Sequence, residues 1–258
     1  MPDVRLPPHA DLFYPNLNFG VLKHGYTAVV NLQNYYNDLL FGPEAASDAV
    51  AEIRAFDESG IERFATRTQL APNGNLHVDL GAELNASSGQ GTVAAVYARL
   101  VPLRVPERLA GKRVSTEYVV EQIGASGSRD LVHNTGGPTM MPSLGRRQSD
   151  MIFGDRFARP AHLVLANTYW GPRIPFLSDG VAWVCVVNAD GKRYSATTKA
   201  IPARGISLVS LHQLLPNIDT FLGDKAGIIN IHSVNLARKP WVWYGRDDLV
   251  GPVALEHC

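Results

Sequence analysis

The sequence has few cysteines, no excess of charge of either sign and no long hydrophobic run. Cys185 and Cys258 are the two cysteines among 258 residues, so a disulfide framework cannot be the basis of stability. Lysine plus arginine and aspartate plus glutamate both number 24, which leaves no basic field to attract nucleic-acid phosphates. No apolar segment approaches the roughly 18 residues of a membrane span, and residues 1–8 lack the apolar region of a secretory signal. We therefore predict a cytoplasmic protein with no membrane span and no nucleic-acid partner.

Sequence motifs for common catalytic and cofactor sites are absent as well. The eight histidines form no HxH, HxxxH or HExxH pattern, so the usual zinc signatures and the metal motif of cupins are missing. There is no GxSxG motif, P-loop or dinucleotide-binding fingerprint. These absences favour a non-catalytic protein that needs no cofactor.

The sequence does contain an internal repeat with a constant offset between its two copies. Residues 47–51 read SDAVA and residues 178–182 read SDGVA. The same offset relates two turn sequences, which end at Gly60 and at Gly191. It returns at three later pairs: Gly74 with Gly205, Leu80 with Leu211, and Leu84 with Leu215. A shared register of this length indicates that one supersecondary unit occurs twice.

Runs of β-branched and alternating residues between turn sequences predict strands in both copies. The predicted strands are 26–32, 50–56, 61–70, 76–80 and 92–100 in the first copy, and 162–166, 181–187, 193–201, 206–211 and 227–234 in the second. A further strand is predicted at 116–123. Asn31 and Asn167 are predicted to occupy equivalent positions after the first strand of each copy.

This pattern predicts an all-β protein made of two tandem antiparallel β-sandwich domains, immunoglobulin-like in outline and related by the internal repeat. Closed barrels are the alternative. The predicted first sandwich covers residues 10–112 and the second covers residues 157–258. Residues 113–156 are predicted to be a linker that contains one strand and a long loop rich in glycine and proline.

The two copies differ on one face of a shared strand. The residues expected to face inward are small or aliphatic in both copies: Ala51, Ile53 and Ala55, and Ala182, Val184 and Val186. The alternate positions hold Glu52 and Arg54 in the first copy, but Trp183 and Cys185 in the second. We expect this opposite face to be solvated in the first copy and apolar in the second. An exposed apolar face favours a covering partner.

Aromatic residues concentrate in the second copy, on loops and near the C-terminus, and a polar loop separates the two copies. Rigid aromatic side chains in such places are typical of protein interfaces and of carbohydrate-binding sites. The candidate ligand or interface residues are Tyr169, Trp170, Trp183, Trp241, Trp243 and Asn134.

These observations favour a non-catalytic binding or assembly protein. Its partner would be a protein subunit, most simply a second copy in a homo-oligomer, or a carbohydrate. The alternative is an enzyme whose site lies in the cleft between the domains. His24, His133 and His257 would then act as acid–base groups or hold a divalent transition metal. A subunit of a virus-like shell is a third hypothesis.

Overall fold

The computed structural model describes residues 4–23, 25–36, 46–88, 93–124, 126–133, 147–153, 160–167, 178–236, 241–244 and 254–257. The N-terminal elements are η1 (Ala10–Leu12), β1 (Phe13–Tyr14), β2 (Asn16–Val21), β3 (Thr27–Gln33), β4 (Ala49–Phe56), β5 (Glu62–Leu70), β6 (Asn75–Asp79), α2 (Leu80–Ser88), β7 (Val93–Pro102), η2 (Glu107–Leu109), β8 (Val114–Ser115), β9 (Val119–Ile123) and β10 (Arg129–His133). The C-terminal elements are β11 (Arg147–Phe153), β12 (Pro160–Ala166), β13 (Val181–Val187), β14 (Arg193–Thr197), β15 (Ile206–Ser210), α3 (Leu211–Leu214), α4 (Ile218–Leu222), β16 (Gly227–Val234), β17 (Trp241–Tyr244) and β18 (Ala254–His257).

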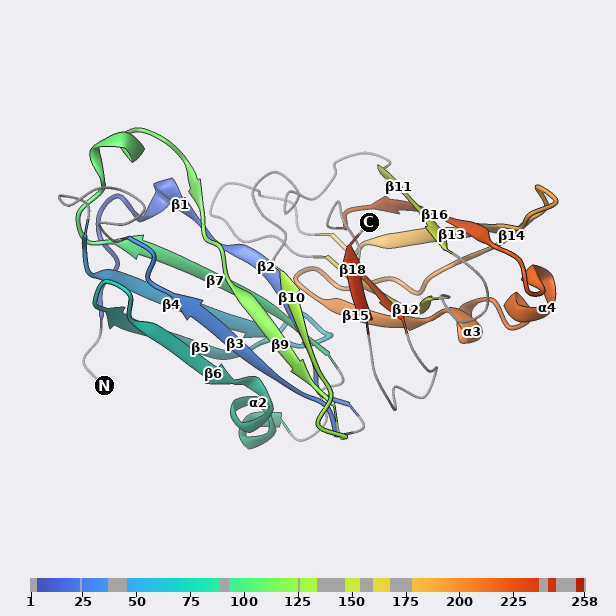
Figure 1. The fold of residues 1–258 in the computed structure, drawn as a ribbon, viewed down its shortest axis with the longest axis horizontal. Helices are drawn as coiled ribbons and strands as arrows, with labels where there is room; N and C mark the ends of the chain where they lie inside the picture. The colour runs from blue at the N-terminus through green and yellow to red at the C-terminus, as the bar shows by residue number, and fades with distance from the viewer. Residues whose placement is uncertain are drawn as a thin grey trace.

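The described strands form four four-stranded antiparallel sheets and one two-stranded parallel pair, β1 with β8. Sheet 1 has the strand order β10-β9-β3-β6, and sheet 2 has the order β2-β7-β4-β5. Sheet 3 has the order β15-β12-β17-β18, and sheet 4 has the order β11-β16-β13-β14. The N-terminal strands lie at one end of the long axis and the C-terminal strands at the other (Figure 1). The predicted all-β class is confirmed.

Three clusters of buried apolar side chains fill the spaces between these sheets. The first joins sheets 1 and 2 and includes Val30 and Ile53. The second joins sheets 2 and 3, where Phe19 meets Trp241, and the third joins sheets 3 and 4. Since successive side chains of a strand point to opposite faces, sheets 2 and 3 contribute side chains from both faces to buried clusters.

The strand residues predicted to face inward do so. On β4, Ala51, Ile53 and Ala55 belong to the first cluster. On β13, Ala182, Val184 and Val186 belong to the third cluster. Period-two alternation alone was sufficient to place these side chains, because both strands are central in their sheets and have a buried side.

Two hairpin turns, one in each copy of the sequence repeat, are built in the same way. The Asp57 carboxylate accepts hydrogen bonds from the backbone amides of Ser59 and Ile61, at 2.9 and 3.0 Å. The Asn188 side chain accepts from the amides of Asp190 and Lys192, at 3.1 and 2.9 Å. A glycine with positive φ follows in each turn, Gly60 at 77° and Gly191 at 76°. The side-chain bonds and the glycine together define the turn.

Replacing Gly60 by alanine is expected to destabilise the protein by about 3 kcal/mol, and replacing Gly191 by alanine by about 1 kcal/mol. Both changes strain a left-handed backbone. A Cβ at position 60 would also overlap the Ala203 carbonyl oxygen in the turn before β15, whereas the space around position 191 is open within 4 Å. Urea denaturation of Gly60→Ala and of the matched Gly191→Ala variant measures the difference. Equal losses of stability in the two variants would contradict the close contact between the Gly60 turn and the turn that contains Ala203.

The predicted equivalence of Asn31 and Asn167 is wrong, because Asn34 makes the matching bonds. The Asn34 side-chain amide donates to the carbonyls of Ser47 and Leu70, at 2.9 and 3.0 Å. The Asn167 amide donates to the carbonyls of Ser178 and Ile201, both at 2.9 Å. The two pairs of acceptors are related by the offset of the sequence repeat. The side-chain oxygen of Asn31 instead accepts a hydrogen bond from Nδ1 of His77 on the neighbouring strand, which a sequence comparison does not show.

The residues predicted to form a linker contribute strands to both parts of the chain. β9 and β10 belong to sheet 1, where β9 pairs with β3. β11 belongs to sheet 4, where it pairs with β16. The strand predicted at 116–123 corresponds to β9, which begins later, at Val119. It belongs to the N-terminal sheets because it pairs with β3. Among the described residues every helix is shorter than a membrane crossing requires.

Candidate binding surface

Trp183 lies in the middle of β13 and points away from the third cluster. Ala182 and Val184, its neighbours along the strand, are fully buried, whereas Trp183 is 38% exposed. The adjacent strands place Thr197 on one side of Trp183 and His232 on the other. The outer face of sheet 4 therefore presents an indole ring to solvent, as the alternation predicted.

The Trp183 and His232 rings pack against each other and line a hollow. Their centroids are 5.0 Å apart and their planes are inclined by 48°. The hollow has a volume of about 420 Å³, and its other lining residues are Val181, Thr197 and Val234. This volume is in the range of small-ligand pockets, and the lining is mainly apolar with two polar groups.

Apolar exposure on sheet 4 extends beyond the hollow. Ile228 and Val234 on β16 are 38% and 39% exposed, and both side chains lie on the face that carries Trp183 because their antiparallel partners are Val187 and Val181. Cys185 is on the same face but is only 2% exposed, so it is not part of the exposed apolar surface. Burial raises the pKa of its thiol, although the Arg193 charge opposes this shift.

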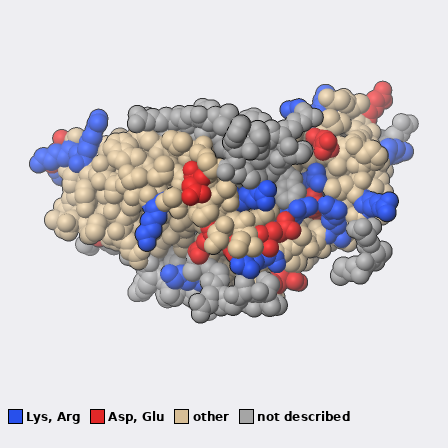
Figure 2. Space-filling view, turned by 180° about the vertical axis from the view of Figure 1, so that it is seen from behind, with Lys and Arg blue, Asp and Glu red and all other residues tan. Residues whose placement is uncertain are grey.

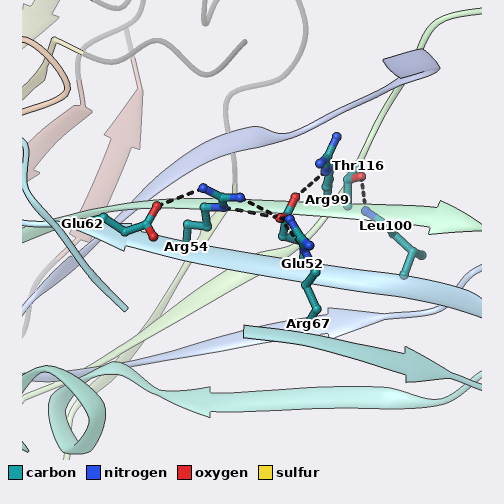
Figure 3. A network of polar contacts seen from close by, with 7 residues as sticks. All are labelled: Glu52, Arg54, Glu62, Arg67, Arg99, Leu100 and Thr116. Carbon is teal, nitrogen blue, oxygen red and sulfur yellow. Dashed lines mark hydrogen bonds and ion pairs between the residues drawn. The ribbon is translucent and has the colours of Figure 1, made fainter. Parts of the chain in front are cut away.

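The position in sheet 2 that corresponds to Trp183 in the sequence repeat holds an ionic cluster. Glu52 is 3% exposed, so the expectation that this face is solvated is wrong at this residue. Its carboxylate is covered by three arginine side chains that converge on it from β4, β5 and β7 (Figure 3). Oε2 contacts Nε of Arg99 at 2.5 Å, and Oε1 contacts Nη2 of Arg67 at 2.7 Å and Nη2 of Arg54 at 3.1 Å.

The arginines determine the charge state of Glu52. Burial by itself raises the pKa of a carboxyl group, but the charge of Arg99 and the hydrogen bonds and charges of Arg67 and Arg54 outweigh it. The net effect is that the pKa of Glu52 is lowered below its ordinary value of 4.5. Glu52 is therefore ionised at neutral pH and holds the guanidinium groups in place. Arg54 also contacts Glu62, at 3.0 Å.

The two sites differ in the size of the side chains beside the central residue. In sheet 2 the cross-strand neighbours of Glu52 are Arg99 and Arg67, and their long side chains cover it. In sheet 4 the cross-strand neighbours of Trp183 are His232 and Thr197. These side chains are shorter, and a hollow remains next to the indole.

Trp241, another candidate for ligand contact, is completely buried between sheets 2 and 3. Its ring meets that of Phe19 edge to face with centroids 5.0 Å apart. Val164 and Ile206 belong to the same cluster. Trp241 is therefore part of the packing between the N-terminal and C-terminal sheets, rather than of an exposed surface.

The remaining predicted site residues are only partly placed. Tyr169, Trp170, Asn134 and His24 lie outside the described residues. The backbones of Trp243, His133 and His257 belong to β17, β10 and β18, but their side chains are outside the described part. β10 and β18 contact each other, which brings the strands of His133 and His257 together. Among the described residues, no three His, Cys, Asp or Glu side chains gather to hold a metal ion.

Sequence reasoning missed His232, Thr197 and the burial of Glu52. Thr197 could have been identified from the sequence, because the short hairpin turn between β13 and β14 fixes the register that places Thr197 beside Trp183. His232 and Arg99 come from strands far along the chain, and only the sheet order brings them beside Trp183 and Glu52.

Charged side chains of both signs lie near one another on the face of the molecule shown in Figure 2. No protein-family model matches the sequence, and no curated protein shows significant similarity to it.

Proposed function

We propose that the chain consists of two β-sandwich units related by an internal repeat. Support comes from the strand orders. Sheet 2 and sheet 4 have the order β2-β7-β4-β5 and β11-β16-β13-β14, and sheets 1 and 3 match in the same way when sheet 3 is read from β18. The matching hydrogen bonds of Asn34 and Asn167, and of the two hairpin turns, add local support. Each unit resembles an immunoglobulin domain only in having two antiparallel sheets packed against each other.

We propose further that this is a non-catalytic assembly protein, which binds a second copy of itself through the outer face of sheet 4. The exposed Trp183 ring beside the hollow is the observation that carries the proposal. Aromatic side chains next to a hollow are typical anchors of protein interfaces. None of the described residues that line the hollow is a lysine, arginine, aspartate or glutamate, so the hollow favours an apolar partner surface.

The two outermost faces of the four-sheet stack differ in polarity. The outer face of sheet 1 carries a hydrogen bond between Asn31 and His77 at 2.5 Å and an ion pair between Glu121 and Arg129 at 2.9 Å. The outer face of sheet 1 also has one exposed apolar side chain, Leu131, whereas the outer face of sheet 4 has three, those of Trp183, Ile228 and Val234. Since the chain already covers an apolar face of sheet 2 with sheet 3, sheet-on-sheet packing is a mode of contact that this sequence uses. A chain with no net charge meets no long-range repulsion from its own copy.

Trp183→Glu is expected to convert a dimer into a monomer, because the variant places a charge at the centre of an apolar contact. Light scattering coupled to size exclusion measures this. The wild-type mass should be about twice the chain mass of 28.1 kDa, and the variant should have the mass of one chain. Leu131→Glu is the matched control, since Leu131 is 58% exposed on sheet 1 and the dimer should persist.

A wild-type protein that stays monomeric at high micromolar concentration would contradict self-association. Oligosaccharides that then quench the fluorescence of the wild type, but not of Trp183→Phe, would indicate a carbohydrate ligand instead. If the partner were instead a different protein, light scattering would show the wild type as a monomer and oligosaccharides would not quench its fluorescence. That result would also contradict self-association.

A further inference from the structure

The contact between sheets 2 and 3 joins two unlike faces of the sequence repeat. Sheet 2 corresponds in the repeat to sheet 4, and sheet 3 corresponds to sheet 1. The faces that correspond to the two contacting faces are therefore the outer face of sheet 4 and the outer face of sheet 1, at opposite ends of the stack of sheets. A contact between unlike faces that repeats from one copy to the next produces an open filament or a ring.

Two cross-strand pairs on the contacting face of sheet 3 are apolar. On β12 and β15, Val164 is opposite Leu208, and Ala166 is opposite Ile206. All four side chains pack in the second cluster, where Val164, Ala166 and Ile206 are almost completely buried. β15 also lies against β7 of sheet 2. These pairs are therefore part of the surface that holds sheets 2 and 3 together.

The corresponding two pairs on the outer face of sheet 1 are polar. On β3 and β6, Asn31 is opposite His77, and Gln33 is opposite Asn75. β3 and β12 align because the asparagine with the matching hydrogen bonds directly follows each of them. Nδ1 of His77 donates to the side-chain oxygen of Asn31 at 2.5 Å, and the other two side chains are exposed. An apolar sheet packed on these pairs would remove their polar groups from water, which is unfavourable.

Sheet 4 keeps apolar side chains where sheet 2 contacts sheet 3. In sheet 2, Phe56 of β4 is opposite Ala95 of β7, and both belong to the second cluster. The corresponding pair in sheet 4 is Val187 with Ile228, and Ile228 is 38% exposed. Leu131, which is exposed on sheet 1, lies on β10 at the opposite edge of that sheet from β6. At the positions that the contact inside the chain uses, one end of the stack is apolar and the other is polar.

We propose that the pairs of Asn31 with His77 and of Gln33 with Asn75, the capping pairs, prevent the stack of sheets from continuing into a second copy. Self-association then closes as a two-fold dimer with sheet 4 against sheet 4, which leaves a polar sheet 1 at each end. Terminal units of repeat proteins carry a polar outer face for the same reason, because it keeps them soluble. This dimer depends on the self-association proposed above, and the role of the capping pairs depends on the proposed repeat.

Asn31→Val combined with His77→Leu gives sheet 1 the residues that sheet 3 has at the corresponding positions. Sedimentation velocity of the full-length protein over a range of concentrations measures the result. The wild type should stop at the mass of two chains. The double variant should have a weight-average mass at least about twice that of the wild type at ~100 µM, and this mass should rise with concentration.

Gln213→Leu combined with Thr220→Val is the matched control for added apolar surface. Both side chains are exposed, on α3 and α4, and this variant should remain a dimer. Circular dichroism shows which variants are folded. If the first double variant does not fold, Gln33→Ala combined with Asn75→Ile alters the other capping pair and should produce the same large species.

Adding Trp183→Glu to the first double variant tests the direction of growth. Head-to-tail stacking needs the sheet 4 face as well as the altered sheet 1 face, so the triple variant should be a monomer. Large species in the triple variant would show that the altered sheet 1 associates unspecifically, and would overturn the role of the capping pairs. A folded double variant that remains a dimer would overturn it as well.

Failure of self-association and failure of the capping role give different results for the wild type. A monomeric wild type overturns the two-fold dimer, whereas the capping role is still supported if the double variant forms large species that Trp183→Glu abolishes. A wild type that itself forms species larger than a dimer supports self-association, but it overturns both the capping role of sheet 1 and the two-fold symmetry.

Discussion

Trp241→Ala is expected to lower the free energy of unfolding by about 3–5 kcal/mol. The indole is completely buried in the second cluster, against Phe19 from sheet 2 and among Val164 and Ile206 from sheet 3. Removing it leaves a cavity between the N-terminal and C-terminal sheets and ends an edge-to-face contact. Guanidinium denaturation followed by circular dichroism measures the loss.

Two further substitutions make this result specific. Trp241→Phe should cost less than Trp241→Ala, because it keeps an aromatic ring and removes an indole N–H that has no hydrogen-bond partner among the described residues. Trp183→Ala removes the same side chain from an exposed position, and its cost should stay near or below about 1 kcal/mol. A loss of equal size at positions 183 and 241 would show that the second cluster does not stabilise the fold.

Glu52→Gln is expected to lower the free energy of unfolding by about 2–3 kcal/mol at neutral pH. The substitution removes the charge that balances Arg99, Arg67 and Arg54 at a buried position, and loss of one partner of a buried ion pair costs about 3–5 kcal/mol. We expect a smaller value because the arginines are partly exposed and regain water. Glu62→Gln is the control at the exposed end of the cluster and should cost less than about 1 kcal/mol.

The effect of Glu52→Gln should also depend on pH. The folded-state pKa of Glu52 is lowered from its ordinary value of 4.5, so its stabilising contribution is complete above that value and is lost as the pH falls through the folded-state pKa. The difference in unfolding free energy between wild type and variant should therefore shrink as the pH falls from about 7 to about 3. Urea titrations along this pH range measure it, and a difference that grows toward acid would refute the assigned role of the arginines.

The local features of the fold could be predicted because short-range interactions determine them. The turns at Asp57 to Gly60 and Asn188 to Gly191 depend on a capping side chain and on a glycine a short distance along the chain. The exposure of Trp183 follows from alternation along one strand. One residue of the candidate binding surface, Trp183, could therefore be predicted from the sequence, because it alternates with the inward-facing residues of its strand.

The prediction failed where a second strand or sheet determined the outcome. Glutamate is typical of a solvated position, but the pairing of β4 with β7 brings Arg99, which is 47 residues away in the sequence, over Glu52 and helps to bury it. Trp241 has the pattern of a surface aromatic, but the packing of sheet 3 on sheet 2 buries it. Asn31 and Asn34 are indistinguishable by residue type, and only the backbone carbonyls around Asn34 decide between them.

The sequence by itself determined the all-β class, the inward faces of the strands, the hairpin turns and the exposure of one tryptophan. Each depends on residues adjacent along the chain, so the periodicity of the strand and the chemistry of the turn are sufficient. The tertiary structure alone decided the order of the four sheets, the burial of Trp241, the arginine cluster around Glu52 and the hollow beside Trp183. These depend on which distant strands become neighbours, and that choice is made by burial of apolar area over the whole chain.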